Sequence, residues 1–469
     1  MGTILSPAVK SDLRAMLRDG AQRAKRQGQP TLVSITDEIE ALDAIDLYER
    51  AGLKVSDRFF WSHPDEGLTI VGLGITQALD AVEESRFRQV GTAWRLLSDR
   101  AIVEAPGRLP GLGPLFFGGF AFDPQHPHSD LWQGYPDGRM VLPSVMLTLR
   151  DGTAWLTCNV MAGPDSDLDA EIAATVALYE ELAAPTLTRY RAGRVRADLH
   201  ELQPADAWQA RIRTTTRDIA ESKLEKVVLA RTVRLQASEP FDTAQALERL
   251  SSHYPDCFIF AVARGERCFL GATPERMAKV NDGQFSAMGL AGSARRGTTP
   301  AEDNALGAQL LNSAKDQHEH MVVVQALLDG LGDLCETLHV PPSPTLLKLK
   351  NVQHLHTPLS GTLRQGVTLL DVVERLHPTP AVGGHPRDVA LALIREREGF
   401  DRGWYAGPIG WIDGRGNGEM AVAIRSGLVH QNEAFLFAGC GIVAGSDPER
   451  EYAESCAKLR PMLLALTGE

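Results

Sequence analysis

Three residues near the end of the chain could hold a metal ion and an anion together. Glu451, Glu454 and Lys458 lie in a segment of helical character, and residues three or four apart on a helix share one face. Their side chains should therefore project together, as two carboxylates beside an ammonium group. Carboxylate oxygens suit a hard divalent cation such as Mg²⁺. We expect this segment to form one wall of a site for a metal and an anionic substrate.

Two residues elsewhere could carry acid–base chemistry. Lys226 opens an apolar run that predicts a strand, and Glu275 follows Pro274 in a turn after another predicted strand. Burial disfavours a charged side chain, so a buried lysine could act as a base and a buried glutamate could stay protonated as an acid. Taken segment by segment, a solvated strand end and a solvated turn carboxylate are the commoner situations. Both interpretations stay open at this point.

A third carboxylate, Glu319, lies between His318 and His320 on a predicted helix. Two histidines two residues apart diverge on a helix, and the H-E-x-x-H spacing of a zinc site is absent. We therefore expect Glu319 to be an oxygen donor for Mg²⁺ that joins the carboxylates near the end of the chain. His354 ends a predicted strand, where a structural histidine is the usual explanation.

The elements that must position these residues form a mixed pattern of short strands and a few helices. Helices are predicted over 6–27, 166–186, 205–223, 304–334 and 448–464, and strands over 31–35, 58–74 (two strands), 116–122, 151–161, 226–235, 257–264, 267–271, 276–281, 347–352, 404–414, 419–429 and 434–444. Hairpin-like strands favour an α+β fold with largely antiparallel sheets. Residues 376–386, rich in proline and glycine, predict a shaped loop of the kind that often lines sites. Residues 187–204 form a polar connection between two halves.

The composition narrows the function further. The 469 residues carry a formal net charge of −12, which argues against nucleic acid as a partner. No apolar run is long enough to span a membrane, and the start of the chain lacks the pattern of a secretory signal. The six cysteines are scattered without a C-x-x-C pair, as in a reducing cytoplasm. We expect a cytoplasmic enzyme for a small molecule.

In their order along the chain, these segments resemble the chorismate-utilising enzymes, most closely the isochorismate synthases. The matching blocks are 226–231, 271–276, 290–297, 313–320, 352–355, 377–384, 404–411, 423–426, 438–445 and 451–458, and the segments 59–61 and 117–122 also look like that family. The resemblance implies an α/β chorismate-binding, anthranilate synthase-like fold, with two stacked, largely antiparallel sheets and helices outside. Residues 1–200 would be its amino-terminal half and residues 201–469 its catalytic half, together one structural domain.

The resemblance also implies roles for residues. Lys226 would activate water for addition at C2 of chorismate, and Glu275 would protonate the hydroxyl leaving C4. Glu319 and Glu454, with Glu451 acting through water, would hold Mg²⁺. The implied substrate-binding residues are Ala291, Gly292, His354, Thr379, Tyr405, Arg425, Gly439, Gly441 and Lys458, with Arg425 and the amides near Gly439 and Gly441 gripping the enolpyruvyl carboxylate.

Alternatives within the family use other nucleophiles or a further elimination. Anthranilate-type synthases take ammonia from a glutaminase partner and carry a Pro-x-Gly-x-x-x-Gly-x-Pro-Lys run, whereas this chain reads Pro-Thr-Pro-Ala-Val-Gly-Gly over 378–384. We therefore expect no glutaminase subunit, and a monomer or weak dimer. A salicylate synthase shares the lysine and also eliminates pyruvate. A catalytically silent chorismate-binding homologue is the non-enzymatic alternative. The long amino-terminal half favours menaquinone over siderophore biosynthesis.

Overall fold

The computed structural model describes residues 7–107, 109–183, 193–221, 224–350 and 352–468. Its helices are α1 (Pro7–Gln27), α2 (Ala44–Ala51), α3 (Arg86–Ser98), α4 (Leu168–Ala183), α5 (Ala205–Glu221), α6 (Thr243–His253), α7 (Pro300–Asn312), α8 (Ala314–Leu331), α9 (Leu369–Leu376), α10 (Arg387–Arg397) and α11 (Pro448–Thr467), with short 3₁₀ helices at Pro64–Glu66 and Asp130–Trp132. None of these helices combines the length and apolar character needed to cross a bilayer.

The strands form two large sheets. The first contains β1 (Thr31–Ile39), β2 (Asp57–His63), β3 (Leu68–Leu73), β5 (Ile102–Glu104), β8 (Val145–Arg150), β9 (Thr153–Ala162), β10 (Ala197–Glu201), β11 (Lys226–Ala237), β12 (Phe258–Arg264), β13 (Arg267–Thr273), β19 (Gly384–His385), β22 (Ser426–His430) and β23 (Glu433–Ile442). The second contains β4 (Gln77–Ala81), β6 (Leu115–Phe120), β7 (Gly138–Leu142), β14 (Arg276–Asn281), β15 (Gln284–Arg295), β16 (Cys335–His339), β17 (Thr345–Lys348), β18 (Val352–Leu363), β20 (Pro408–Asp413) and β21 (Gly418–Val422).

Both sheets are almost entirely antiparallel, and the one parallel pair in the described part of the chain is β1 with β5. The first sheet has the order β10-β11-β23-β22-β13-β12-β2-β3-β8-β9-β1-β5, and the second β16-β18-β15-β14-β21-β20-β6-β7-β4. Strands from before and after residue 200 are neighbours in each sheet, for example β12 with β2 and β20 with β6. The predicted antiparallel α+β architecture is confirmed.

The side chains of β2 show how the sheets are stacked. Phe59 and Trp61 belong to the apolar core shared by both sheets, where each ring lies against Phe117 of β6 at 5.6 and 5.9 Å between centroids. Phe60 points the other way and meets Tyr48 of α2 at 6.1 Å. Successive side chains of a strand alternate between faces, so β2 contributes to the layer between the sheets and to the layer beneath the helices.

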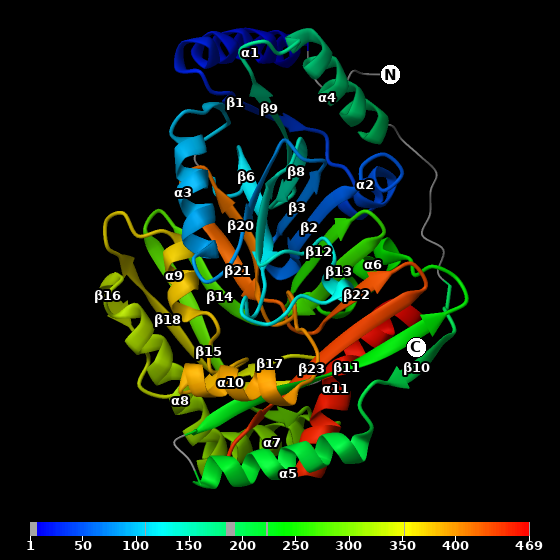
Figure 1. Ribbon diagram of the computed structural model, residues 1–469, viewed down its shortest axis with the longest axis vertical. Helices are drawn as coiled ribbons and strands as arrows, with labels where there is room; N and C mark the ends of the chain where they lie inside the picture. Colours follow the sequence, from blue (N-terminus) through cyan, green and yellow to red (C-terminus); the bar gives the residue numbers. More distant parts are fainter. Residues whose placement is uncertain (1–6, 108, 184–192, 222–223, 351, 469) are drawn as a thin grey trace.

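Helices cover the outer faces of this sandwich, as Figure 1 shows. The core beneath the first sheet includes residues of α1, α2, α4, α6 and α11, while α3, α8 and α9 contact strands of the second sheet. Strands β11 and β23 in the first sheet and β15 and β18 in the second run through the lower half of the view, beside α10 and α11. These elements carry most of the residues predicted to do chemistry.

Several element boundaries differ from the prediction. The single helix expected over 304–334 is two helices, because Ser313 has an extended backbone and its hydroxyl caps α8 by accepting from the Asp316 amide. The strand expected over 419–429 is also two, β21 and β22, which lie in different sheets. Residues 404–407 precede β20 as a turn. Positions 6, 184–192, 222–223 and 351 of the predicted segments lie outside the described residues.

Other elements were not predicted at all. The segments without a predicted helix or strand contain strands β4, β5, β7, β8, β15 and β16, most of β18, and helices α2, α3, α6, α9 and α10. Within the polar connection over 187–204 the structure has the short strand β10. The loop over 376–386 is largely irregular, as expected, but its Gly384 and His385 pair with Val227 and Lys226 as strand β19. This pairing fixes the loop against the strand that begins with Lys226.

One buried ion pair holds the centre of this arrangement together. Glu398 and Arg402 are 1% and 3% exposed, and Arg402 Nε donates to Glu398 Oε2 at 2.7 Å. Glu398 also accepts from the amide of Ala230 at 2.6 Å. The Arg402 guanidinium donates to the carbonyls of Val382 at 2.9 Å and Val228 at 2.8 Å. The pair thus joins β11, the loop over 376–386 and the segment before β20.

Glu398→Gln should destabilise the protein strongly, because it leaves the Arg402 charge buried without a carboxylate. Removing one partner of a buried pair lowers the free energy of unfolding by about 3–5 kcal/mol. The control is Asp19→Asn, which breaks the exposed pair of Asp19 with Arg23 at 2.8 Å and should lower it by less than about 1 kcal/mol. Urea unfolding of both variants measures the difference, and equal effects would contradict a central role for the buried pair.

Candidate active site

A cavity lies where the elements of both sheets meet. The predicted site residues that line it are Lys226, Glu275, Ala291, Gly292, Glu319, His354, Tyr405, Arg425, Gly439, Gly441, Glu454 and Lys458. Residues that are hundreds of positions apart in the sequence are therefore brought together in one space. Concave sites with a few converging polar groups are the usual places for ligands.

Two predicted residues do not line this cavity. Thr379 is buried, but its contribution is its carbonyl, which accepts from the amides of Val382 and Gly383 and shapes the loop. Ala381 and Val382 of this loop line the cavity instead. Glu451 lines a neighbouring hollow together with Glu319 and Glu454.

Lys226 is buried at the start of β11 and is only 2% exposed. Its Nζ lies 2.7 Å from Oε1 of Glu319 on α8, so a buried cation has a carboxylate partner. A side chain at position 441 would not fit beside this pair, because its Cβ would lie 2.8 Å from Glu319 Oε1 and 2.9 Å from Lys226 Cε. Gly441 therefore leaves the space in which the lysine and the glutamate meet.

Glu275 sits between β13 and β14 in the cavity wall, where it is 7% exposed. Burial raises its pKa to about 7, although the positive charges of Lys226, Lys458 and Arg425 oppose the shift. The carboxyl group therefore keeps its proton under conditions in which a solvated glutamate is ionised. This is the state required of the predicted acid.

The helix α11 presents the expected face of two carboxylates and a lysine. Lys458 Nζ lies 2.6 Å from Glu454 Oε1 and donates to the carbonyl of Gly439 at 2.9 Å. Burial opposes ionisation of Glu454, but Lys458 holds the pKa of this carboxyl below its usual value. Burial and the charge of Glu454 raise the pKa of Glu451 to about 7. One carboxylate is thus ionised and its neighbour is readily protonated.

The chemistry of these donors fits a divalent cation. Carboxylate oxygens of Glu451 and Glu454, and the Cys440 sulfur, lie within 4.8 Å of one another. Glu319 lines the same hollow but points to Lys226 in this structure. Two carboxylates that repel each other in a buried place are relieved by a cation, and their oxygens are the ligands that Mg²⁺ prefers. The residues present therefore fit the expected metal.

Arg425 is the cation of the cavity that lacks a carboxylate. It forms no ion pair with any residue that the structure describes, its Nε has no hydrogen-bond partner, and burial lowers the pKa of its guanidinium. The prediction placed it on a strand, but it lies between β21 and β22 with φ of 53°. At this left-handed turn the chain passes from β21 in the second sheet to β22 in the first.

His354 and Gly292 face each other across a β-bulge. The pairing of β15 with β18 shifts between Ala291 and Ser293, and Gly292 takes a φ of 73° there. His354 Nδ1 lies 2.8 Å from Ser293 Oγ and 3.3 Å from the Gly292 carbonyl. Burial and the nearby Arg425 and Lys458 lower the histidine pKa to about 3, so the ring is neutral. His354 is near the start of β18, not at a strand end.

The glycines near the end of β23 leave room for neighbouring side chains, in addition to any contact that their backbone makes. Gly439 and Gly441 lie within β23 and pair with Ala230 and Val228 of β11. A Cβ at position 439 would lie 3.2 Å from the Tyr405 hydroxyl. The Tyr405 ring stacks on Phe437 at 5.1 Å between centroids, and burial raises the Tyr405 pKa to about 12. These positions bring the neutral phenol to the cavity wall.

Sequence reasoning missed Arg402, which lines the cavity and lies over the Phe122 ring at 4.1 Å. Its partner Glu398 precedes it by four residues, a spacing that is common for ion pairs on helices. The spacing of the pair was the available signal, but the pair lies in a run of charged residues over 395–402, and nothing in the sequence shows that both side chains are buried.

The raised Glu275 pKa makes a prediction for stability. Glu275 binds its proton up to about pH 7 when folded and up to about pH 4.5 when unfolded. Its contribution is therefore fully present below pH 4.5 and is lost as the pH rises through 7. Between about pH 5 and pH 8, the native protein should lose about 2.5 kcal/mol of unfolding free energy relative to Glu275→Gln, which cannot ionise.

Urea unfolding of both proteins at the two pH values, with a chelator present, measures this difference. Glu449→Gln on the exposed face of α11 is the control and should track the native protein. A difference between the native protein and Glu275→Gln that does not change with pH would show that Glu275 is ionised in the fold.

Comparison with known proteins agrees with this geometry. The chain matches the family described as "Chorismate binding enzyme" over residues 19–467. It is 38% identical over 467 residues to isochorismate synthase MenF of Bacillus subtilis, covering 98% of this chain and 99% of that protein. It is 37% identical over 460 residues to the salicylate biosynthesis isochorismate synthase of Pseudomonas aeruginosa, covering 97% of this chain and 94% of that protein.

Solved structures show the same fold. MenF, the menaquinone-specific isochorismate synthase from Escherichia coli, superposes with a TM-score of 0.78 at 26% identity, covering 96% of this chain and 100% of that chain. Anthranilate synthase component I from Streptococcus pneumoniae has the fold in common, with a TM-score of 0.70 at 21% identity, covering 84% of this chain and 92% of that chain. The family match over nearly the whole length, together with the fold, shows that this chain belongs to the chorismate binding enzymes.

Proposed function

We propose that the protein is an isochorismate synthase, an isomerase that converts chorismate into isochorismate. The observation that carries the proposal is a single cavity lined by a buried lysine, a glutamate whose pKa burial raises to about 7, and a buried arginine without an ion-pair partner among the described residues. Both full-length relatives are named isochorismate synthases. The relatives' names further support a role in menaquinone or siderophore biosynthesis.

In the proposed reaction a water molecule adds at C2 of the ring while the C4 hydroxyl departs. Lys226 is paired with Glu319 as a cation in the free protein, so it must first lose a proton, and in its neutral form it then takes a proton from the water as the C2–O bond forms. The ring double bonds shift, the C4–O bond breaks, and Glu275 gives its proton to the departing oxygen. The product has the composition of the substrate, and one water is consumed as one is released.

The charges of the cavity support binding of a dianion. Arg425 is available for the enolpyruvyl carboxylate because it has no ion-pair partner among the described residues. Glu319, Glu451 and Glu454 would hold Mg²⁺, which supplies positive charge for the ring carboxylate. Lys458 holds the carboxylate of Glu454 in place. The neutral His354 contacts Ser293 and so supports the β-bulge of β15. An acidic protein needs such local positive charge to bind an anion.

Water as the nucleophile is favoured by Lys226 and by the loop over 378–384. The loop lacks the Pro-x-Gly-x-x-x-Gly-x-Pro-Lys run of the ammonia-using members. We infer that no glutaminase subunit is required, and that the protein acts as a monomer or weak dimer. Residues 1–200 and 201–469 would then be halves of one domain in the cytoplasm.

Incubation with chorismate and Mg²⁺, followed by chromatography, tests the activity and its alternatives. We expect isochorismate as the product. Salicylate together with pyruvate would indicate a salicylate synthase, and anthranilate formed only with ammonia would indicate an anthranilate synthase. A folded protein that binds chorismate without turnover would be the silent homologue.

Lys226→Ala should keep the fold and metal binding but lower kcat by at least about 100-fold, because it removes the proposed base. The measurements are isochorismate formation and Mg²⁺ titration by calorimetry. Lys54→Ala, on the surface after α2, is the control and should keep full activity. Turnover of Lys226→Ala near that of the control would remove Lys226 from the mechanism.

The two carboxylates of α11 should differ in their effect on the metal. Glu454 is the proposed direct ligand and Glu451 the proposed water-mediated one, so Glu451→Gln should raise the Kd for Mg²⁺ by about 10- to 100-fold and Glu454→Gln by more. Calorimetric titration in the presence of chorismate measures both constants, with Glu449→Gln as the control. If Glu451→Gln raised the Kd more than Glu454→Gln, Glu451 would be the direct ligand and Glu454 the water-mediated one.

A further inference from the structure

A second hollow adjoins the catalytic cavity along α11. It lies between α11, the end of α6, the end of β15 and the residues Leu349, Lys350 and Val352, and we call it the α11 groove. Its volume of about 410 Å³ is in the range of small-molecule sites. Pro274, Ser293, Arg425, Glu454 and Lys458 line both spaces. The groove therefore shares a wall with the cavity and opens on its outer side.

The walls of the groove are mainly apolar. Ala453 and Ala457 of α11 are exposed along one side, and Pro461 continues that side one turn later. Leu349 and the Tyr254 ring lie on the other sides. Small side chains on the helix leave a slot, and the flat phenol ring suits a planar ligand.

The rim of the groove is positively charged. Lys350 and Arg460 are exposed at the groove, and neither forms an ion pair with any residue that the structure describes. Lys350 Nζ lies 5.7 Å from the centre of the Tyr254 ring. Among the described residues, Glu454 is the one carboxylate that lines the groove, and Lys458 already pairs with it at 2.6 Å. An anion at the rim would meet these two cations, and no carboxylate without an ion pair lines the groove among the described residues.

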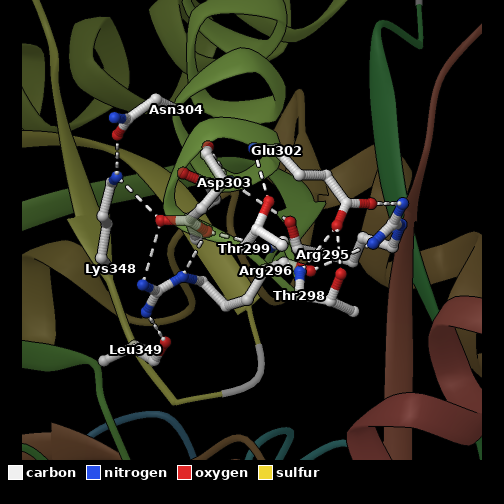
Figure 2. A network of polar contacts seen from close by, with 11 residues as sticks. Arg295, Arg296, Thr298, Thr299, Glu302, Asp303, Asn304, Lys348 and Leu349 are labelled. Atoms are coloured by element: carbon white, nitrogen blue, oxygen red, sulfur yellow. Dashed lines mark hydrogen bonds and ion pairs between the residues drawn. The ribbon is translucent and has the colours of Figure 1, made fainter.

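A polar network around Asp303 holds the chain that precedes Lys350, as Figure 2 shows. Asp303, on α7, accepts from Arg296 Nε at 2.7 Å and from Lys348 Nζ at 2.9 Å. The same carboxylate accepts from the amide of Gly297 at 3.0 Å. The turn after β15 and the chain leading to Leu349 and Lys350 are thus tied to one helix. Arg296 also donates to the Leu349 carbonyl, so the backbone of the chain that leads to Lys350 is held before any ligand arrives, which favours binding.

We propose that the α11 groove binds a small ring compound with one carboxylate, such as an aromatic or cyclohexadiene acid, and that its occupant weakens substrate binding in the catalytic cavity. The apolar slot would take the ring, and Lys350 and Arg460 the carboxylate. The coupling follows from the shared wall, because an anion in the groove draws on the charges of Arg425 and Lys458 that the substrate also needs. This second part rests on the proposed function.

Benzoate is the probe for the binding part, measured by calorimetry and by ligand-observed NMR on the full chain without substrate. We expect saturable binding, and a Kd at least fivefold higher for the double variant Lys350→Gln with Arg460→Gln. The control, Lys25→Gln with Arg26→Gln, removes the same charge from the end of α1 and should bind benzoate as the native protein does. Absence of saturable binding, or an equal Kd in the two double variants, would overturn the proposal.

A steric variant separates the groove from the cavity. Ala457→Phe should fill the slot, abolish benzoate binding and leave kcat within about twofold of the native value. With chorismate as substrate, benzoate should raise the KM of the native protein and have little effect on either the Ala457→Phe variant or the groove double variant. Equal inhibition of all three proteins would place benzoate in the catalytic cavity and overturn the coupling. Because binding is measured without turnover, an inactive protein that still binds benzoate in the groove would disprove only the proposed function and the coupling.

Discussion

The buried pair of Glu398 and Arg402 is the interaction on which the site depends. An arginine that is 3% exposed would be very unfavourable without a carboxylate, and Glu398 supplies one while binding the amide of Ala230. The remaining guanidinium donors fix two carbonyls, one on β11 and one in the loop over 376–386. Because β11 begins with Lys226 and the loop supplies Val382, the pair sets the distance between the proposed base and the wall that faces it.

The charges in the cavity follow one pattern. Lys226 is matched by Glu319, Lys458 by Glu454 and Arg402 by Glu398, while burial raises the pKa of Glu275 to about 7, so that its carboxyl group is readily protonated. Arg425 remains without an ion-pair partner among the described residues. In a cavity where every other charge is matched or absent, an unmatched arginine is a place for an anion from outside. Its position in a left-handed turn between the sheets explains why a residue with such an unfavourable environment is held there.

The sequence is sufficient to predict the surroundings of a residue when they are determined by its neighbours in the chain. The face formed by Glu454 and Lys458 follows from helical spacing. The apolar run that Lys226 opens predicted a strand but left the burial of the lysine open, because a solvated strand end was the commoner situation. The break at Ser313 was not predicted because the flanking segments are both good helices, and only the capping geometry shows that they are separate. Arg402 was missed for a different reason. Its burial depends on β11 and the loop over 376–386, which are distant in sequence.

The resemblance to a known family identified the residues of the site by their positions in the chain. The structure adds what the atoms around each of them do. Gly441 shows this most clearly. It was expected to offer a backbone amide, yet its missing side chain is what allows Lys226 and Glu319 to meet, since a Cβ there would lie under 3 Å from atoms of both. The same glycine lines the hollow of Glu319 and Glu454. One position without a side chain therefore lies beside both the proposed base and the proposed metal ligands, and alanine at 441 would require the ends of the Lys226 and Glu319 side chains to shift.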